Sequence, residues 1–434
     1  MHLLFAMNAS AQDLSIPHEQ YQLDNGLNVV LVEDHSLPQV VINLWYGVGS
    51  KDEVAGRTGF AHLFEHLMFM GTTRLPDSGF DDLMEGHGGW NNAWTSEDAT
   101  DYYEVGPSSL AELFLWMEAD RMDGLASAMT QEKLDLQRDV VRNERRQSYE
   151  NSPYGEVWLV MPEALYPESH PYAHTVIGSH EDLEAATLQD VVDFFDTWYV
   201  PNNASLVVAG DIDVDETKAV IDQLFGHLEM KELPDRAQVP TPVKPEKALI
   251  ELTDDSVEVP LTMTIWHSPA ALQAGDAELD VVSGILASGR SSRLYQRLVD
   301  SGIALEVDAW QYSQLLSSIY GVEAKPAEGH TVEEIEAIVY EELAKLAAEG
   351  PTEAELERVV NAYEMRFIRN LESLQARASA LNRYHYLVGE PDYLAQDLDR
   401  YKRVDAEGVK AAAALLTRER AATFRVYPAD GEVE

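Results

Sequence analysis

The segment His62-Leu63-Phe64-Glu65-His66 contains side chains that can bind a metal and move a proton. Residues four apart in a helix lie on one face, so His62 and His66 can direct two imidazoles at one point, with Glu65 beside them. Two imidazole ligands leave room for a third protein ligand and a water, which is the arrangement of catalytic zinc. Zinc lowers the pKa of its water to about 7, and a neighbouring carboxylate can pass the released proton to a leaving amine. This chemistry is amide hydrolysis.

The same residues could instead be two helix histidines on a partly exposed face, with a solvated glutamate between them. The flanking residues argue against that interpretation because they make the helix apolar nearly all round: Phe60, Leu63, Phe64, Leu67, Met68 and Phe69. Two histidines and a carboxylate in a buried helix need partners, and a metal would satisfy all three. The order H-x-x-E-H is also the inverted form of a known zinc peptidase motif. We therefore expect one Zn²⁺ per chain.

Turn signals and hydrophobic periodicity predict the elements around this segment. Asn25-Gly26 is a strong turn signal between two alternating segments, so residues 20–33 are expected to form a hairpin. Residues 58–70 are expected to form the buried helix with the two histidines. The other elements predicted in this half are strands over 40–47, within 90–105 and over 204–210, and helices over 108–122, 131–149 and 188–198.

A chain of 434 residues is too long for one ordinary core, and a proline-rich stretch divides it. Residues 230–245 are predicted to be a linker because they contain Pro234, Pro240, Pro242 and Pro245. The two sides are weakly similar, since VINLW (41–45) matches TMTIW (262–266) and each precedes a helix. The second such helix, near residues 279–286, has no ligand pair. We expect an α+β protein with two similar tandem domains, each a mostly antiparallel sheet packed with helices: a metal-binding domain over 12–229 and a non-catalytic domain over 246–434.

The composition excludes several function classes. Lys and Arg number 31 and Asp and Glu 76, so the net charge is 31 − 76 = −45. A field of this sign repels phosphate backbones and anionic lipids, so no nucleic acid is expected as a partner. The charge could attract basic peptides, but it is more typical of a solvated acidic surface. The chain contains no cysteine, which excludes disulfides, thiolate metal sites and Cys nucleophiles.

The pattern of the first residues is relevant to the cellular location of the protein. No run of about 18 apolar residues exists, so no transmembrane segment is expected. Residues 1–11 resemble the end of a signal peptide, with an apolar run over 3–7 and Ala9-Ser10-Ala11 as a cleavage site. The preceding basic region is missing, so this segment could also be an ordinary terminus. We expect a periplasmic or otherwise exported protein, with the cytoplasm as the alternative.

Three segments of the first half resemble one peptidase family: GRTGFAHLFEHLMFMGT (56–72), GGWNNAWTSEDATDYY (88–103) and VVRNERRQSYENSPYG (140–155). They are similar to the pitrilysin–insulysin–mitochondrial processing peptidase family of inverted-motif zinc peptidases. The second half is less similar, and GRSSRLYQRL (289–298) is its clearest match. The resemblance implies that Glu144 is the third zinc ligand, from a separate helix, and that Glu65 is the general base. Many relatives have a second glutamate where this chain has Gln137, which implies tuned rather than lost activity.

Residues 88–95 resemble the family's edge strand beside the metal. An extended peptide could add to this edge through main-chain hydrogen bonds, in contact with Asn92, Ala93 and Thr95. Such binding tolerates many side chains and fits an oligopeptidase. The alternative is an ordinary hairpin strand whose glycines mark a turn. Three further histidines match a non-catalytic family segment and are interpreted as structural: His170, His174 and His180.

The family's second half contributes an Arg and a Tyr that contact the substrate carbonyl, which is an oxyanion-stabilising role. Val299 and Leu305 stand at the matching positions here. In short relatives, two half-size chains pair like a clamshell, one with the zinc and the other with the Arg/Tyr pair. The resemblance therefore implies a zinc endopeptidase of oligopeptides that is the metal-bearing subunit of a heterodimer, although a homodimer is also possible. Two alternatives stay open, a catalytically silent structural subunit and a presequence-processing peptidase.

Overall fold

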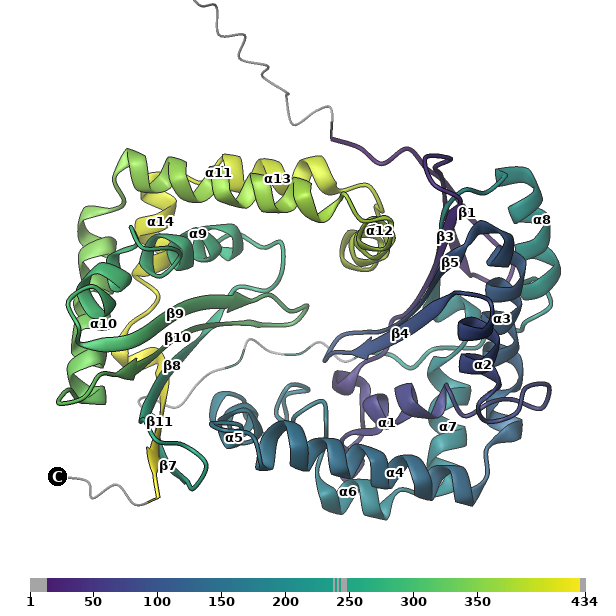
Figure 1. Cartoon of the computed structure of the whole chain (residues 1–434), viewed down its shortest axis with the longest axis horizontal. Coiled ribbons are helices and arrows are strands. Elements are labelled where there is room, and N and C mark those ends of the chain that lie inside the picture. The colour runs from purple at the N-terminus through teal and green to yellow at the C-terminus, as the bar shows by residue number, and fades with distance from the viewer. Residues whose placement is uncertain (1–13, 237–238, 240–241, 243–247, 430–434) are drawn as a thin grey trace, which may run out of the picture.

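The computed structural model describes residues 14–236, 239, 242 and 248–429, which form two lobes, each built on one sheet (Figure 1). The strand order of the first sheet is β1-β2-β6-β3-β5-β4. β2 and β6 are parallel, and the other neighbours are antiparallel. The strands of this sheet are β1 (Glu19–Gln22), β2 (Asn28–Glu33), β3 (Gln39–Tyr46), β4 (Trp90–Thr95), β5 (Thr100–Pro107) and β6 (Ala204–Gly210).

The second sheet repeats the first one without an equivalent of β1. Its strand order is β7-β11-β8-β10-β9, with one parallel pair, β7 and β11, at the same place as β2 and β6. Its strands are β7 (Ala248–Asp254), β8 (Leu261–Ser268), β9 (Ala304–Tyr312), β10 (Ser318–Pro326) and β11 (Ala421–Pro428). β3 thus corresponds to β8, and the edge strand β4 corresponds to the edge strand β9. The prediction of two similar, mostly antiparallel α+β halves is confirmed.

Fourteen helices in the described residues pack on these sheets. In the first half they are α1 (Phe60–Leu67), α2 (Gly79–Gly86), α3 (Ala111–Ala128), α4 (Gln131–Arg145), α5 (Glu156–Leu165), α6 (His180–Ala185), α7 (Leu188–Trp198) and α8 (Val214–Phe225). In the second half they are α9 (Asp276–Leu286), α10 (Val332–Glu349), α11 (Glu353–Asn370), α12 (Leu374–Val388), α13 (Leu394–Lys402) and α14 (Ala406–Ala413). The helix predicted over 131–149 ends earlier, at Arg145, where a π-helical turn over Arg146–Glu150 continues the chain.

Each half covers the sheet of the other half with one helix. α12 packs on β3 and β6 of the first sheet, and α5 packs on β7 and β11 of the second (Figure 1). Leu381 and Tyr384 of α12 belong to one apolar cluster with Val41 and Val207. Strands β2, β3 and β6 are buried almost throughout, so both faces of this sheet need a covering layer. Each sheet is therefore covered in part by a helix from the other half. The domain limits of 12–229 and 246–434 stay a prediction.

The link between the halves is only partly described. Residues 230–236, 239 and 242 of the predicted linker form neither helix nor strand. Arg236 holds this part to the first half, with its Nε 3.2 Å from Oδ1 of Asp52. The rest of the linker and the signal-peptide prediction for residues 1–11 lie outside the described residues. In the described part of the chain, no helix has the length and apolar content needed to cross a membrane.

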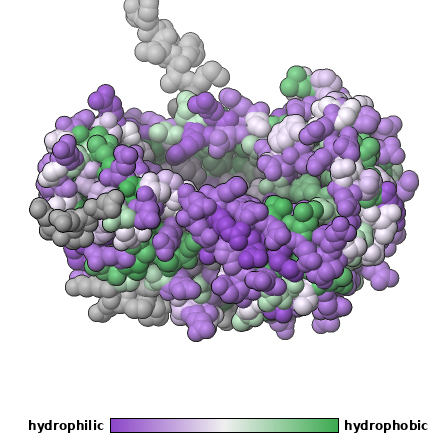
Figure 2. All heavy atoms as spheres, turned by 60° about the horizontal axis from the view of Figure 1, so that its bottom comes forward, coloured by the Kyte–Doolittle hydropathy of each residue, from purple (hydrophilic) through white to green (hydrophobic). Residues whose placement is uncertain are grey.

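The surface is mainly hydrophilic, as the charge of the chain predicts. Figure 2 shows mostly purple side chains on the outside, with pale and apolar ones inside the hollow between the two lobes. The edge strand β4 and the end of β9 face each other across this region in Figure 1. The interior between the lobes is therefore the place to look for a site.

Candidate metal centre and substrate cavity

Helix α1, which contains the H-x-x-E-H segment, has a fixed start. Gly59 precedes it with φ +88°, and a Cβ there would lie 2.7 Å from the carbonyl oxygen of Ile177. The Glu53 carboxylate accepts hydrogen bonds from the backbone N–H groups of Gly59 at 3.0 Å and Ala61 at 2.8 Å. These amides belong to the group at a helix start that has no partner within the helix. Glu53 therefore caps α1 from outside the motif.

The buried side of α1 rests on aromatic residues. The ring of Phe64 lies 4.5 Å from that of Tyr199 and is stacked on that of Phe195 at 5.6 Å, measured between centroids. Leu63 and Leu67 are also buried. His62, Glu65 and His66 are only half-buried, so the three chemically active side chains share the side of α1 that faces away from this core.

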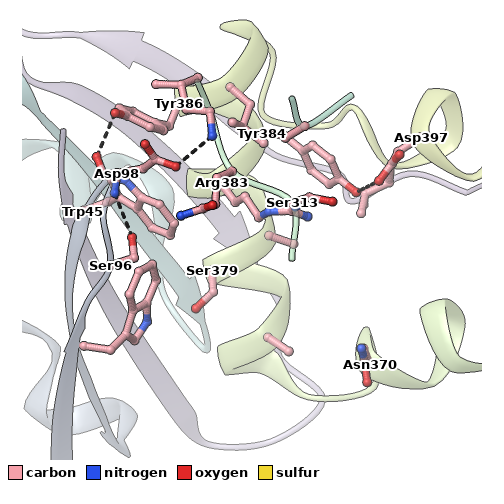
Figure 3. Close-up of a pocket in the computed structure, with 18 of the residues that line it drawn as sticks. Trp45, Ser96, Asp98, Ser313, Asn370, Ser379, Arg383, Tyr384, Tyr386 and Asp397 are labelled. Carbon is pink, nitrogen blue, oxygen red and sulfur yellow. Dashed lines mark hydrogen bonds between the residues drawn. The ribbon is translucent and has the colours of Figure 1, made fainter. Parts of the chain in front are cut away.

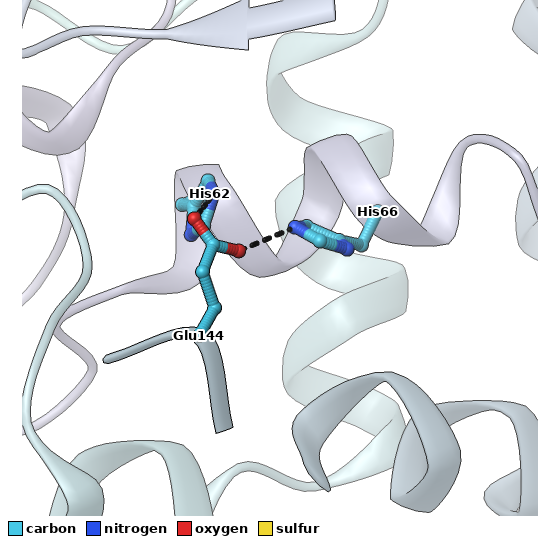
Figure 4. A group of neighbouring side chains, drawn as sticks. All are labelled: His62, His66 and Glu144. Atoms are coloured by element: carbon cyan, nitrogen blue, oxygen red, sulfur yellow. Dashed lines mark ion pairs between the residues drawn. The ribbon is translucent and has the colours of Figure 1, made fainter. Parts of the chain in front are cut away.

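The structure brings His62, His66 and Glu144 together (Figure 4). Nε2 of His66 lies 3.3 Å from Oε2 of Glu144, and Nε2 of His62 lies 3.7 Å from Oε1. One ligand atom from each residue lies within 4.8 Å of the other two. Ligands at zinc bond lengths in a tetrahedron are about 3.4 Å apart, so the donor types and the spacing both fit Zn²⁺. This is the one such group among the described residues.

Helix α4 supplies Glu144 from its last turn. The helix begins after Thr130, whose hydroxyl accepts a hydrogen bond from the N–H of Lys133 at 3.3 Å. Arg145 fixes the end of the helix, because its Nη1 donates to the carbonyl of Gly178 at 2.8 Å. Gln137 lies two turns before Glu144, and its amide contacts Sδ of Met70 at 2.7 Å, just beyond α1. Gln137 therefore ties α4 to α1 and is not part of the metal group.

Burial and close approach set the protonation of these groups. Burial lowers the pKa of His62 to about 4, so this imidazole is neutral at pH 7, which is the form that binds a metal. The hydrogen bond with His66 lowers the pKa of Glu144, which keeps it a carboxylate. Burial raises the pKa of Glu65, which suits a group that accepts and returns a proton. Nδ1 of His62 is buried without a hydrogen-bond partner among the described residues.

A cavity of about 920 Å³ opens beside the metal group and contains Glu65. The Thr95 hydroxyl donates to Oε2 of Glu65 at 2.5 Å, so the end of β4 orients the carboxylate. Ala93 and Thr95 line the cavity, whereas Asn92 is exposed and does not line it. β4 is the edge strand of its sheet, and the N–H of Ala93 donates to Oδ1 of Asn92 at 2.9 Å.

A second cavity of about 750 Å³ adjoins the first one and shares Trp94, Thr95, Ser96 and Tyr312 with it (Figure 3). Helix α12 forms one wall of this second cavity, with Ser379 and Arg383 on the same face, four residues apart. Asp98 closes the junction, because its carboxylate accepts hydrogen bonds from the Tyr172 hydroxyl at 2.5 Å and the N–H of Leu315 at 2.8 Å. Both halves therefore build the space around β4.

Other residues singled out in the sequence lie elsewhere. His170 stacks on Tyr166, and the remaining two histidines lie near glutamates, His174 3.5 Å from Glu53 and His180 2.9 Å from Glu150. These three histidines do not belong to the metal group. Val299 ends a π-helical turn, and Leu305 in β9 is 56% exposed.

Sequence reasoning missed several residues around the site. Glu53 stood among 76 acidic residues with no motif to mark it, and Glu97 lay inside the family-like segment 88–103 without being singled out. Trp158 and Met161 of α5 and the end of β9, with Trp310 and Tyr312, also line the cavity. No signal in the sequence could have placed Trp310, because it comes from the other half of the chain.

Comparison with known proteins shows the family of the chain. Residues 28–166 match the family model described as insulinase (peptidase family M16), and residues 185–363 match the peptidase M16 inactive domain. The chain belongs to peptidase family M16. The M16 relatives include a protein named zinc protease PqqE of Helicobacter pylori, 30% identical over 410 residues, which are 92% of this chain and 91% of that protein. Another, named a probable mitochondrial-processing peptidase subunit beta of Arabidopsis thaliana, is 23% identical over 90% of this chain and 74% of that protein.

Solved structures show the same M16 fold. A protease from Helicobacter pylori superposes with a TM-score of 0.85 and 27% identity, over 95% of this chain and 100% of that one. The periplasmic protease PqqL from Escherichia coli gives a TM-score of 0.77 at 19% identity, over 95% of this chain but 48% of that one. This M16 chain therefore has the fold of about half of PqqL.

Proposed function

We propose that this chain is a zinc-dependent endopeptidase that hydrolyses oligopeptides, with the metal held by His62, His66 and Glu144. The observation that carries the proposal is the convergence of two imidazole Nε2 atoms and a carboxylate within 4.8 Å, beside a cavity that contains Glu65. Bound Zn²⁺ would activate a water and polarise the substrate carbonyl. Family membership and the relatives named zinc proteases support this assignment.

The chain's own residues divide the remaining work. Glu65 accepts a proton from the attacking water and returns it to the leaving amine. Thr95 holds the Glu65 carboxylate through the 2.5 Å hydrogen bond. A peptide adds to the free edge of β4, where a peptide carbonyl can replace the Asn92 side chain as acceptor for the N–H of Ala93. Main-chain pairing of this kind places the scissile bond beside the metal and tolerates many side chains.

The proposal includes a second subunit. Val299 and Leu305 replace the Arg and Tyr expected to stabilise the oxyanion, and neither side chain can donate a hydrogen bond. The length of the chain, about half that of PqqL, fits a half-size subunit that closes a chamber with a partner. We therefore infer a heterodimer in which this chain carries the metal, with a homodimer as the alternative. Export is also part of the proposal, on the pattern of residues 1–11.

Two other functions also have observations in their favour. A silent structural subunit would explain why the Arg/Tyr pair is absent. A presequence-processing peptidase would fit the relative named as a processing peptidase subunit and a chain of net charge −45. The intact metal group and Glu65 favour a peptidase over the silent subunit, and comparing cleavage of basic presequence-like peptides with neutral oligopeptides separates the two peptidase functions.

Metal analysis of the purified protein tests the proposal. We expect about one zinc per chain in the wild type and little in His66→Ala, because two ligands hold zinc poorly. Glu65→Gln should keep its zinc and lose turnover by about 10²–10⁴-fold or more, because it removes the general base but no ligand. Folded protein without zinc, even after zinc is added, would support the structural subunit. An active Glu65→Gln would refute the role of Glu65.

A further inference from the structure

One carboxylate in the cavity beside the metal group has no part in the proposed reaction. Glu97 follows β4 by two residues and lines the same cavity as Glu65 and Glu144. No Lys or Arg is among the described residues that line this cavity. Glu97 has no ion pair in the described part of the chain, and its Oε2 accepts a hydrogen bond from the Tyr312 hydroxyl at 3.1 Å. Burial raises the pKa of Glu97, and hydrogen bonds from Tyr312 and Gln314 offset this only in part, so the charged form is favoured when a cation approaches.

Aromatic side chains line the same cavity as this carboxylate. The rings of Trp158 and Trp310 lie 5.9 Å apart at 32°, and both line the cavity with Tyr149 and Tyr312. Trp158 is 42% exposed and Tyr312 is 45% exposed, which leaves ring surface free to contact a ligand. Aromatic faces attract cations, and long basic side chains pack their apolar stems on such surfaces. A carboxylate among free aromatic rings is complementary to a lysine or an arginine.

The adjoining cavity has the opposite character. Arg383 lines it and forms no ion pair with a described acidic residue, while Asp98 and Asp397, on opposite sides of the same cavity, are already bonded to protein groups (Figure 3). A peptide that extends along β4 past Thr95 passes between the two cavities, which share that residue. A basic side chain of this peptide is therefore favoured in one of the two cavities, the one with Glu97 and the metal group.

We propose that Glu97 selects peptides that carry a lysine or an arginine beside the scissile bond. The ammonium or guanidinium group donates hydrogen bonds to the Glu97 carboxylate, and the apolar stem packs on Trp158 and Trp310. This inference rests on the proposed peptidase function and names its substrate class. Glu97 determines specificity and takes no part in bond cleavage.

A structural role of Glu97 is the competing explanation. The hydrogen bond from Tyr312 joins β9 to the segment after β4 and so links the two halves. Glu97→Gln keeps an oxygen that can accept this bond and removes only the charge. Glu163→Gln is a matched control, because Glu163 is an exposed residue of α5 that does not line the cavity.

The first test compares two peptides that differ at one position next to the cleaved bond, lysine against norleucine. We expect the wild type to prefer lysine in kcat/KM, and Glu97→Gln to reduce this preference by roughly 10- to 100-fold, as for loss of a hydrogen bond to a charged group. Glu163→Gln should keep the wild-type preference. Glu97→Lys should shift the preference toward a peptide with glutamate at that position. An unchanged lysine preference in Glu97→Gln overturns the proposal.

Binding separates this inference from the proposed function. The dissociation constants of the same two peptides are measured with Glu65→Gln and with Glu65→Gln/Glu97→Gln. If Glu65→Gln binds the lysine peptide more tightly than the norleucine peptide and the double variant does not, selection by Glu97 is supported. This holds even if the wild type hydrolyses nothing. Hydrolysis by the wild type with equal binding of both peptides would keep the peptidase and reject selection by Glu97.

Discussion

Arg121 is a fully buried charge that supports the wall of the site. It lies on α3 with 0% exposure and bonds Glu118 of the same helix and Glu104 of β5, with Nη2 3.2 Å from Oε1 of Glu104. Its guanidinium also lies over the rings of Phe80, at 4.3 Å, and Tyr102, at 4.7 Å. The network thus fixes β5, which pairs with β4, the strand that borders the cavity.

Arg121→Met should destabilise the protein by about 3–5 kcal/mol, because it leaves two carboxylates buried without a cation. The free energy of unfolding in urea measures this loss. Arg403→Met is the control and should change stability by less than about 1 kcal/mol, since Arg403 is 79% exposed and its pair with Asp399 lies in solvent. A loss below about 1 kcal/mol in Arg121→Met would show that the network contributes little.

The sequence identifies some of these residues and not others, for a physical reason. Positions four apart on one helix must share a face, so the spacing of His62 and His66 predicts a joint site from local geometry alone. Glu144 could be singled out only by the family resemblance, because a lone glutamate in an acidic chain has no local signature. Glu97 contacts Tyr312 of the other half, and Arg121 contacts Glu104 of β5 as well as its local partner Glu118, so no local pattern encodes the long-range contacts. The metal-binding and catalytic roles themselves stay predictions.

At the scale of elements, the start of α1 decides the geometry of the metal group. The helix has eight residues, and His62 is the third of them, so it lies in the first turn. Glu53 satisfies the N–H groups of Gly59 and Ala61 from a buried position. Short helices depend on tertiary contacts because they have few hydrogen bonds of their own. Glu53 therefore affects both the stability of α1 and the position of the metal ligands on it.

Glu53→Ala should lower stability by about 2–4 kcal/mol, because two buried amides lose their acceptor, and it should weaken zinc binding. Glu53→Gln keeps one of the two acceptor oxygens and should recover only part of both properties. Urea unfolding and competition with a chelator provide the two measurements. Glu85→Ala, at an exposed position of α2, serves as the control. Unchanged zinc affinity in folded Glu53→Ala would limit Glu53 to an effect on stability.

The strength of local signals sets which elements could be predicted. Helix α7 and strand β6 have the predicted limits, since a clear N-cap at Thr187 and a continuous apolar run mark them. The identity of the sheet that α12 covers could not be predicted. An apolar face shows that a helix packs on something, but not on what. Asn382 of α12, which donates to Oδ1 of Asn43 at 2.6 Å, is a contact of this non-local kind.

At the scale of the whole molecule, the two halves repeat the same strand order but differ in their chemistry. The metal group lies in the first half, and none is found among the described residues of the second. Val299 and Leu305 stand where the family resemblance implies an Arg and a Tyr. If a partner supplies that pair, then restoring it in this chain should replace the partner in part, because two copies could then serve each other.

Val299→Arg/Leu305→Tyr should raise kcat of the chain alone by about 10²–10³-fold, the usual worth of an oxyanion donor. Leu305 is exposed, so the new tyrosine need not disturb the core. Val299→Arg/Leu305→Phe lacks the hydroxyl and is the control. Peptide hydrolysis at equal zinc content is the measurement. Full activity of the wild type alone, as a homodimer, would instead remove the need for a different subunit.

Helix α12 also affects how the chain matures during synthesis. The strands of the first sheet are complete at Gly210, but α12 begins at Leu374, which is 374 − 210 = 164 residues later. At ribosomal speeds of about 5–20 residues per second this delay is roughly 8–33 seconds. Throughout that interval the apolar face around Val41 and Val207 has no cover from α12. The nascent first half is thus a natural client for chaperones until the second half emerges.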